Sequence, residues 1–430
     1  MAECSRCLLS DEIGGVHIHN GECNFCRSYR AKWESASRQR EELAFHKAVR
    51  EIRDDYAGRC VVPLSGGIDS AYTAYYVKSV LGLNPVAVTF HNGFQAPFAA
   101  KVISRLKEKI GLDHVYTQMD EELKKRVYQT CFKKVGEVCT ACNSLIYWSV
   151  YKYSADNGLP HIVFGVCSRS ENSPIYDGVR YCRDSLFREI LSGDLTEEEI
   201  HSVSVNKVMA NGDFRLINLP DFVDASRDLI TGELIDAGIL DHEDIIGGTK
   251  HRDCLLTPLN SGTKKKKYGF KKKLLTLAFL VREGQLTRED ALSELSVEYG
   301  KVDASEALAI VKDALELDDA DMAEYWQRSR MTYVKGKRTV REIIEAYEAE
   351  VEEDADLETR IAILVEQINS ELLAEGGALH DPQLVEKGLL KLKASGVCRV
   401  CVLKDLVLTN FSEAIFLRAL PDDVKGVMIR

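Results

Sequence analysis

Long hydrophobic runs are absent from this 430-residue sequence, in which no stretch approaches the roughly 20 apolar residues that a membrane-spanning helix needs. A basic segment followed by an apolar one, the pattern of a secretory signal peptide, is also absent from the N-terminus. These two absences argue against a membrane protein and against a secreted one. We expect a cytoplasmic protein with no membrane partner.

An excess of basic residues is lacking as well. The sequence has 56 Lys and Arg against 67 Asp and Glu, a formal net charge of −11, which disfavours non-specific binding to nucleic acid. One local exception is the lysine-rich run KKKKYGFKKK at 264–273, which is either a patch for an anion or substrate or a solvated segment of helix or loop. A partner such as tRNA is therefore possible but not favoured.

Cysteine, in contrast, is abundant. In a reducing compartment, 13 cysteines indicate metal binding or catalysis rather than disulfides. Most of them form C-x-x-C pairs, which are Cys4/Cys7, Cys23/Cys26, Cys139/Cys142 and Cys398/Cys401. The first two pairs, separated by a short spacer, predict a ribbon that binds Zn²⁺ tetrahedrally. An N-terminal iron–sulfur site is the alternative, and His17 or His19 is a possible substitute ligand.

The order of apolar and polar segments predicts the domain organisation. A zinc ribbon at 1–30 is followed by a charged, helical connector at 31–58. Between 59 and about 192, strand-like and helix-like segments alternate, which predicts an α/β domain with a doubly wound parallel sheet and helices on both faces. We place this domain at 59–275. The acidic remainder, 276–430, is expected to be mostly helical and shows no internal repeat beyond residue 300.

The predicted elements of the α/β domain follow from these segments. The expected strands are 59–64, 84–90, 114–118 and 161–165, and the expected helices reach Leu81, span 97–110, run through Lys134 and span 143–157. Ligands of such sheets bind beyond the carboxyl ends of the strands. Three polar stretches are expected there: SGGIDS at 65–70, HNGFQ at 91–95 and GVCSRSENSP at 165–174.

The stretch SGGIDS has the features of a phosphate-binding loop. It follows a short apolar strand and precedes a helix. Adjacent glycines allow a sharp turn and close approach to the main chain, and the free N–H groups at the helix start attract an anion. The loop is not a Walker loop, because it lacks the G-K-[ST] ending.

The last two C-x-x-C pairs have several possible roles. Cys139 and Cys142 are expected just before a helix, where their thiolates would ionise readily. They fit an iron–sulfur site, a second zinc site, a redox dithiol or a structural pair. Cys398 and Cys401 fit a dithiol, half of a metal site shared across a dimer, or a buried structural pair.

The SGGIDS loop resembles the PP-loop of the ATP pyrophosphatases, which include GMP synthetase, NAD synthetase and the tRNA thiolases. The resemblance implies that ATP is cleaved to AMP and pyrophosphate while a substrate carbonyl becomes an adenylate, which a nitrogen or sulfur nucleophile then attacks. It implies three sets of ATP contacts: the β and γ phosphates on Ser65, Gly66, Gly67 and Ser70, Mg²⁺ or pyrophosphate near Asp69, and base or ribose near Thr89, Phe90 and Asn92. Lys250, His251 and Arg252 are candidates for neutralising the pyrophosphate.

A cysteine pair at this point, with a third cysteine later, holds an iron–sulfur cluster in the thiolases of that superfamily. By this resemblance Cys139 and Cys142 would bind a [4Fe–4S] cluster, with Cys254 or Cys167 as the third ligand.

Over residues 1–300 the sequence is similar to the N-acetyl sugar amidotransferase family of surface-polysaccharide biosynthesis. The similarity is carried, in order, by GECNFCRSY, SGGIDS, CTAC, GGTKH and FLVREGQLTREDALSEL. It implies that the acyl oxygen of an N-acetyl sugar is adenylated and that ammonia then replaces AMP. Because no glutaminase signature can be placed in this chain, the ammonia would come from a separate glutaminase subunit. We also expect a homo-oligomer.

Differences from that family favour a second hypothesis. The HNGF turn is brief, Thr249 is inserted in the glycine–lysine–histidine stretch, and Cys254 stands where a hydroxyl residue is common. These differences favour sulfur transfer to a tRNA, a nucleotide or a small molecule. The third hypothesis is a non-catalytic nucleotide-binding protein with a helical interaction tail.

Overall fold

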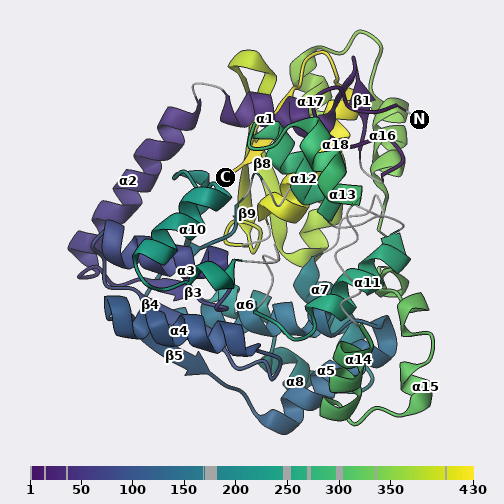
Figure 1. Cartoon of the computed structure of the whole chain (residues 1–430). Helices are drawn as coiled ribbons and strands as arrows, with labels where there is room; N and C mark the ends of the chain where they lie inside the picture. Colours follow the sequence, from purple (N-terminus) through teal and green to yellow (C-terminus); the bar gives the residue numbers. More distant parts are fainter. Residues whose placement is uncertain are drawn as a thin grey trace.

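The computed structural model describes residues 2–13, 16–34, 37–167, 169, 182–245, 253–268, 273–296, 304–334, 337–401 and 404–430. No helix in these ranges is long and apolar enough to cross a membrane. Figure 1 shows the whole chain.

A five-stranded parallel sheet forms the centre of the α/β domain. Its strands are β3 (Val61–Pro63), β4 (Val86–Phe90), β5 (Asp113–Thr117), β6 (His161–Phe164) and β7 (Arg215–Asn218). They lie in the order β5-β4-β3-β6-β7, and every neighbouring pair is parallel. The chain winds outward from β3 in one direction and from β6 in the other, so the switch point lies between these two strands. The prediction of a doubly wound parallel sheet is confirmed.

Helices cover both faces of this sheet (Figure 1). Helices α2 (Ser37–Asp55), α3 (Ile68–Tyr75), α4 (Pro97–Ile110) and α10 (Arg227–Asp236) share one hydrophobic core with the sheet. Helix α6 (Val138–Asp156) covers the opposite face, with α5 (Glu121–Val135) and α7 (Arg183–Leu191) packed beside it. The strands β4 and β6 are buried along their whole length, as expected of strands covered on both faces.

The N-terminal ribbon is a short antiparallel hairpin, β1 (Ile18–His19) and β2 (Glu22–Cys23), which leads into α1 (Asn24–Trp33). It packs on α12 (Lys273–Arg282) and α13 (Arg288–Ser296), with which it forms a separate core. The start of α13 is capped by Thr287, whose Oγ1 accepts a hydrogen bond from the Asp290 backbone N–H.

The C-terminal region is mostly helical, as expected, but it also contains a small sheet. We call residues 340–429 the C-terminal module. Its elements are α16 (Val340–Glu350), α17 (Leu357–Leu372), β8 (Gly377–Val385), β9 (Leu389–Gly396), the π-helical η8 (Lys404–Thr409), α18 (Asn410–Ala419) and β10 (Gly426–Ile429). The strands lie in the order β10-β9-β8 and share one core with α16, α17 and α18.

The described residues form further helices. They are α8 (Glu197–Ser202), α9 (Val205–Ala210), α11 (Thr257–Tyr268), α14 (Ala304–Ala314) and α15 (Asp319–Met322), together with the π-helical η1 (Tyr76–Val80), which extends α3. The first half of the lysine-rich run lies at the end of α11, where Lys266 is exposed and its ammonium sits 4.2 Å from the centre of the Trp326 ring.

A buried ion pair joins α1 to the C-terminal module. Glu413 of α18 accepts hydrogen bonds from Lys32 Nζ at 2.5 Å and from Ser28 Oγ at 2.6 Å. The side chains of Lys32 and Glu413 are only 7% and 3% exposed. Because an isolated charge is costly to bury, each of these two groups depends on the other.

Glu413→Ala leaves Lys32 buried without its counter-charge, so we expect a loss of about 3–5 kcal/mol in the free energy of unfolding. Chemical denaturation measures this loss. Glu345→Ala, which removes one partner of the exposed Arg341–Glu345 pair, is the matched control and is expected to leave the transition nearly unchanged. Equal stability of the two variants would contradict the assignment.

Candidate functional site

The Ser65–Ser70 loop connects β3 to α3 at the carboxyl edge of the sheet. Gly67 is the N-cap of α3, and Gly66 has a positive φ of 84°. A Cβ atom at Gly66 would lie 2.6 Å from the Cβ of Ala99 on α4. Glycine is therefore required here both for the backbone angle and for the close approach of α4.

Side-chain hydrogen bonds hold this loop in one shape. Ser70 Oγ donates to the Gly67 carbonyl at 2.9 Å and accepts from the Ser65 N–H at 3.2 Å. Ser65 Oγ in turn accepts from the Gly67 N–H at 3.1 Å. The loop is thus preorganised at the positive end of α3, as a phosphate-binding loop requires.

The segment that begins at Asp253 lies directly against this loop. The Ala96 N–H donates to the Asp253 carbonyl at 3.0 Å, and the Leu255 N–H donates to the Phe94 carbonyl at 3.0 Å. The Asp253 carboxylate faces Gly67, since a Cβ there would lie 3.0 Å from Asp253 Oδ2. Sequence reasoning did not single out Asp253, because no motif marks it. Lys250, His251 and Arg252, which immediately precede it, lie outside the described residues.

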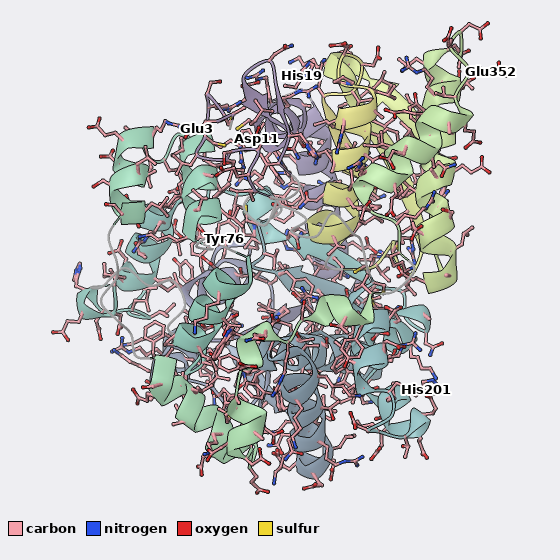
Figure 2. The ribbon with its side chains drawn as sticks, turned by 90° about the vertical axis from the view of Figure 1, so that its right-hand side faces the viewer. Glu3, Asp11, His19, Tyr76, His201 and Glu352 are labelled. Atoms are coloured by element: carbon pink, nitrogen blue, oxygen red, sulfur yellow. The ribbon has the colours of Figure 1, made fainter. Side chains whose placement is uncertain are left out.

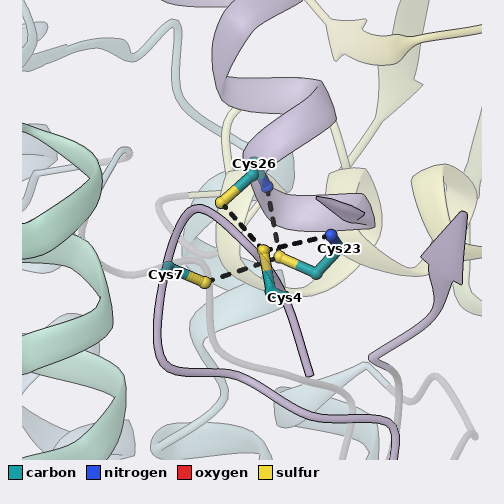
Figure 3. Close-up of side chains that lie close together, drawn as sticks. All are labelled: Cys4, Cys7, Cys23 and Cys26. Atoms are coloured by element: carbon teal, nitrogen blue, oxygen red, sulfur yellow. Dashed lines mark hydrogen bonds between the residues drawn. The ribbon is translucent and has the colours of Figure 1, made fainter. Parts of the chain in front are cut away.

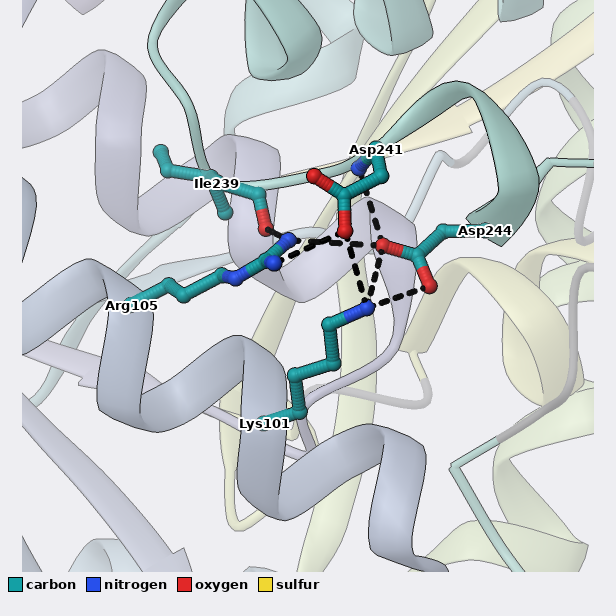
Figure 4. Close-up of polar contacts among 5 residues, drawn as sticks. All are labelled: Lys101, Arg105, Ile239, Asp241 and Asp244. Carbon is teal, nitrogen blue, oxygen red and sulfur yellow. Dashed lines mark hydrogen bonds and ion pairs between the residues drawn. The ribbon is translucent and has the colours of Figure 1, made fainter.

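A charged network holds the chain just before that stretch against α4 (Figure 4). Lys101 Nζ lies 2.9 Å from Asp244 Oδ1 and 3.1 Å from Asp241 Oδ2, and Arg105 Nη2 donates to Asp241 at 2.7 Å. The Arg105 guanidinium, with Lys101, holds the pKa of Asp241 below its usual value. The network thus anchors residues 241–244 to the helix that also contacts Gly66.

The side chains predicted to contact the nucleotide, on β4 and directly after it, mostly bind or pack against other groups of the protein. Thr89 Oγ1 donates to the Leu64 carbonyl at 2.5 Å and lies 2.9 Å from His114 Nε2. Burial lowers the pKa of His114 to about 4. Phe90 is buried in the core, and Asn92 Oδ1 accepts from the Phe94 N–H at 2.8 Å. Their role towards a nucleotide remains a prediction.

Cys139 and Cys142 lie within the first turns of α6, which begins at Val138, and not ahead of a helix as expected. Cys142 and Cys254 pack against the core cluster that contains Tyr128, and the pKa of Tyr128 is raised by burial and by the charges of Cys142, Cys139 and Cys254. The expected easy ionisation is wrong for Cys142, because burial raises its pKa despite the hydrogen bond that Asn92 Nδ2 donates to Cys142 Sγ at 3.5 Å. Burial also raises the pKa of Cys254 to about 11.

Cys142 and Cys254 thus lie at the same core as Tyr128, and Cys139 is one helical turn from Cys142, but the three thiols do not meet as ligands of a single ion do. In the part of the chain that the structure describes, the Cys, His, Asp and Glu side chains that bring three or more ligand atoms within 4.8 Å of one another are the N-terminal cysteines. The iron–sulfur assignment for Cys139, Cys142 and Cys254 remains a prediction.

A cavity of about 300 Å³ opens beside the Ser65–Ser70 loop. Its walls come from α3, from the segments that follow β6 and β7, from α10 and from the end of α12, and they include Asp69, Cys167, Arg169, Asp224, Phe279 and Glu283. The cavity thus occupies the switch point of the sheet, where ligands of this architecture bind. The stretch 165–174 was expected at this edge; of it, Gly165, Val166, Cys167 and Arg169 lie within the described residues.

Arg169 is the dominant cation of this cavity. Its side chain is buried, donates to the Pro220 carbonyl at 2.8 Å and lies 5.6 Å from the centre of the Trp33 ring. Burial opposes its charge, yet the charges of Cys167 and Glu283 raise its pKa. Among the residues that the structure describes, Arg169 Nε has no hydrogen-bond partner, and it lies 3.7 Å from Glu283 Oε1. Sequence reasoning missed Arg169, although it flagged the stretch that contains it.

The four N-terminal cysteines form a compact, buried cluster (Figure 3). Cys4 Sγ lies 3.8 Å from Cys26 Sγ, and Cys7 Sγ lies 3.7 Å from Cys23 Sγ. A tetrahedral ion with metal–sulfur bonds of about 2.3 Å places its sulfurs about 3.8 Å apart, so the cluster fits a single ion such as Zn²⁺. A four-iron cluster holds its thiolates farther apart. The prediction of a four-cysteine metal site is confirmed in its residues.

Two arginines support this cluster from α12 and α13. Arg282 Nε donates to Cys26 Sγ at 3.4 Å, and its burial is offset by the charges of Cys26, Cys7 and Cys23, which raise its pKa. Arg288 donates to the carbonyls of Cys4 and Cys7. Cations and hydrogen bonds at this distance stabilise a metal site that carries four thiolates.

The histidines of the ribbon lie outside the cluster. His19 Nε2 is 3.7 Å from Asp422 Oδ1, and Figure 2 shows His19 beside the C-terminal module. Burial lowers the pKa of His17. Neither residue belongs to the four-ligand group.

Comparison with known proteins gives a partial match. Residues 250–346 are similar to the family described as LPS biosynthesis protein WbpG-like, C-terminal domain. This segment contains Asp253, Cys254 and the helices α12 and α13 that contact the ribbon.

Two curated proteins also match parts of the chain. An uncharacterised protein of Methanocaldococcus jannaschii is 21% identical over 168 residues, which are 38% of this chain and 58% of that protein. The Fe/S biogenesis protein NfuA of Idiomarina loihiensis is 32% identical over 78 residues, which are 18% of this chain and 41% of that protein. The chain therefore spans less than two thirds of either relative.

The thiol geometry predicts that Cys23→Ser and Cys26→Ser each bind one zinc ion fewer per chain than the wild-type protein, because three thiolates do not complete a tetrahedral site. Elemental analysis of protein purified with zinc measures the difference. Cys60→Ser, a buried cysteine of the central core, is the control and retains the full zinc content. Unchanged zinc in both ribbon variants would rule out the site.

Proposed function

We propose that the protein is an ATP-dependent transferase that adenylates a carbonyl oxygen of its substrate and then delivers nitrogen to the same carbon. The nearest activity is that of an N-acetyl sugar amidotransferase of surface-polysaccharide biosynthesis. The observation that supports this proposal best is the juxtaposition of the Ser65–Ser70 loop, preorganised at the start of α3, with the 300 Å³ cavity at the switch point. The similarity of residues 250–346 to an LPS biosynthesis family supports the choice of substrate class.

The loop would hold the β and γ phosphates of ATP through its main-chain N–H groups and the hydroxyls of Ser65 and Ser70. Asp69 lines the cavity and Asp253 faces Gly67, and their carboxylates are suitable oxygen ligands for Mg²⁺. Mg²⁺, when bound, would neutralise charge on the leaving pyrophosphate. Lys250 and His251 come after the anchored 241–244 segment in the sequence. They are proposed to place further positive charge near the leaving pyrophosphate.

The acceptor would lie in the cavity, which is large enough for one sugar ring. Its carbonyl oxygen attacks the α-phosphorus of ATP, the bond to the bridging oxygen of pyrophosphate breaks, and an adenylate forms. Ammonia then adds to the activated carbon, and AMP departs as a proton is lost. The Arg169 guanidinium and the Asp224 and Glu283 carboxylates would orient the polar groups of the acceptor.

Ammonia is proposed to come from a separate glutaminase, and the chain is proposed to work as a homo-oligomer. Both proposals rest on the family resemblance alone.

Sulfur transfer is the second candidate, favoured by one observation. Cys254 directly follows Asp253, which faces the Ser65–Ser70 loop, and it packs with Cys142 against the core cluster that contains Tyr128. An iron–sulfur cluster on these three thiols would lie within one residue of the proposed ATP site. The acceptor would then receive sulfur in place of nitrogen.

Asp69→Asn tests the ATP site. The variant keeps the shape of the side chain but loses its charge, and we expect at least a ~100-fold fall in pyrophosphate release, the magnitude typical of losing one electrostatic contact in an active site. The assay uses a panel of nucleotide-linked N-acetyl sugars with ammonium salt. The control, Asp313→Asn on the exposed side of α14, is expected to behave as wild type.

Pyrophosphate release at the wild-type rate by Asp69→Asn would remove the loop from the mechanism. Binding of ATP without pyrophosphate release by the wild-type protein, whichever acceptor is supplied, would favour a non-catalytic nucleotide-binding protein.

Iron and sulfide analysis of anaerobically purified protein separates nitrogen transfer from sulfur transfer. For nitrogen transfer we expect equal, background levels of iron and labile sulfide in the wild type and in Cys139→Ser, with Cys60→Ser as the matched control. Iron and sulfide that disappear only in Cys139→Ser would instead establish the cluster, and the search would turn to a thiolated product.

A further inference from the structure

The C-x-x-C loop of the C-terminal module, residues 397–401, is docked on the α/β domain. Val400, between the two cysteines, is buried in a core that includes β3, β4 and β6. Its carbonyl accepts a hydrogen bond from Tyr151 Oη on α6 at 2.6 Å. The loop is therefore an internal contact between two parts of one chain.

A third cysteine lies at the same contact. Cys182 is the residue before α7, and its backbone N–H donates to Glu375 Oε1 of the C-terminal module at 3.3 Å. Glu375 is itself held by Lys337 at 3.2 Å. Asn206 Nδ2 donates to Cys182 Sγ at 3.4 Å, a hydrogen bond that a thiolate accepts well.

Cys182, Cys398 and Cys401 line one small cavity of about 40 Å³. Met209, Val397, Val407 and Leu408 make much of its remaining wall apolar. Two cations, Arg183 and Lys404, also belong to the wall. The cavity thus combines three soft ligands, a largely apolar wall and positive charge that offsets thiolates.

We propose that Cys182, Cys398 and Cys401 bind a single thiophilic metal ion, such as Zn²⁺ or Cu⁺, between the α/β domain and the C-terminal module. Three thiolates select soft ions over Mg²⁺ or Ca²⁺. A cavity of about 40 Å³ accommodates one ion with at most a few waters, which favours a single ion over a four-iron cluster. Glu375, in the same wall, is a possible fourth ligand for Zn²⁺.

Ion binding requires the three sulfurs to move closer together. Within the described ranges, the three sulfurs are not gathered within 4.8 Å in the way that the ribbon cysteines are. The ion would draw the C-x-x-C loop towards Cys182 and so fasten the module to the domain. This site differs from one shared by two copies of the C-x-x-C loop, because Cys182 of the same chain completes it.

Cadmium binding by the full-length protein tests the proposal, with Cd²⁺ as the probe and its thiolate charge-transfer absorption as the signal. We expect the wild type to bind one more Cd²⁺ per chain than Cys182→Ala, Cys398→Ala or Cys401→Ala. Cys60→Ala is the matched control and binds as many ions as the wild type. Size-exclusion chromatography records the oligomeric state of each sample.

A second measurement on the wild-type protein does not depend on whether a variant folds. Alkylation followed by mass spectrometry should show that one Cd²⁺ concentration half-protects Cys182, Cys398 and Cys401 together. Full binding by Cys182→Ala, combined with loss in the other two variants, would overturn the proposal in favour of the C-x-x-C pair alone or a site between two chains. Iron and labile sulfide held by Cys398 and Cys401 without Cys182 would overturn it as well.

Discussion

The close approach of four thiols at the N-terminus is the constraint on which the rest of the structure depends. Sulfur atoms 3.7–3.8 Å apart in a buried cluster are stable as thiolates only around a cation. Cys23 is also the N-cap of α1, and Cys26 lies in its first turn, so the cluster sets the direction of that helix. Through α1, the metal site determines the position of side chains far from any cysteine.

Side chains on two faces of α1 contact other parts of the chain, so the position of α1 affects both. One face carries Lys32 and Ser28 to Glu413 and so positions the C-terminal module. The other carries Trp33 to Arg169 and Tyr29 to Glu283, where burial and the Glu283 charge raise the pKa of Tyr29. The ribbon, a unit that is usually thought of as peripheral, thus forms part of the support for the switch-point cavity.

The charges of that cavity come from segments that are distant in sequence. Arg169 follows β6, Asp224 follows β7, and Glu283 follows α12. No local pattern links these residues, because each is a single charged side chain in an ordinary sequence context. Their juxtaposition results from the strand order β3-β6-β7 and from the packing of α12 against the ribbon.

Elements with a strong local signal were predictable from the sequence. The buried strands β3, β4 and β6 are apolar runs, Gly66 marks the sharp turn before α3, and the four ribbon cysteines have the spacing of a metal site. Weak signals led to errors or omissions. Cysteine packs like a small apolar residue inside a helix, so α6 begins before Cys139 rather than after Cys142.

Strand β8 shows a second limit of local reasoning. Most of its residues are exposed, so it lacks the apolar alternation that marks a strand, and its pairing with β9 is stabilised by tertiary contacts of the module. The lining of the cavity is a third limit, since Arg169 and Asp253 acquire their significance only from neighbours on other segments.

The long sequence separation of Lys32 and Glu413 also affects when this ion pair can form during synthesis of the chain. Its two partners are separated by 381 residues, so during synthesis Lys32 leaves the ribosome long before Glu413 exists. At the ~5–20 residues per second of translation, the interval is on the order of tens of seconds. During this interval Lys32 has no counter-charge, so the face of α1 that carries it stays hydrated. The N-terminus of the nascent chain is therefore the first part to be made and among the last to be completed.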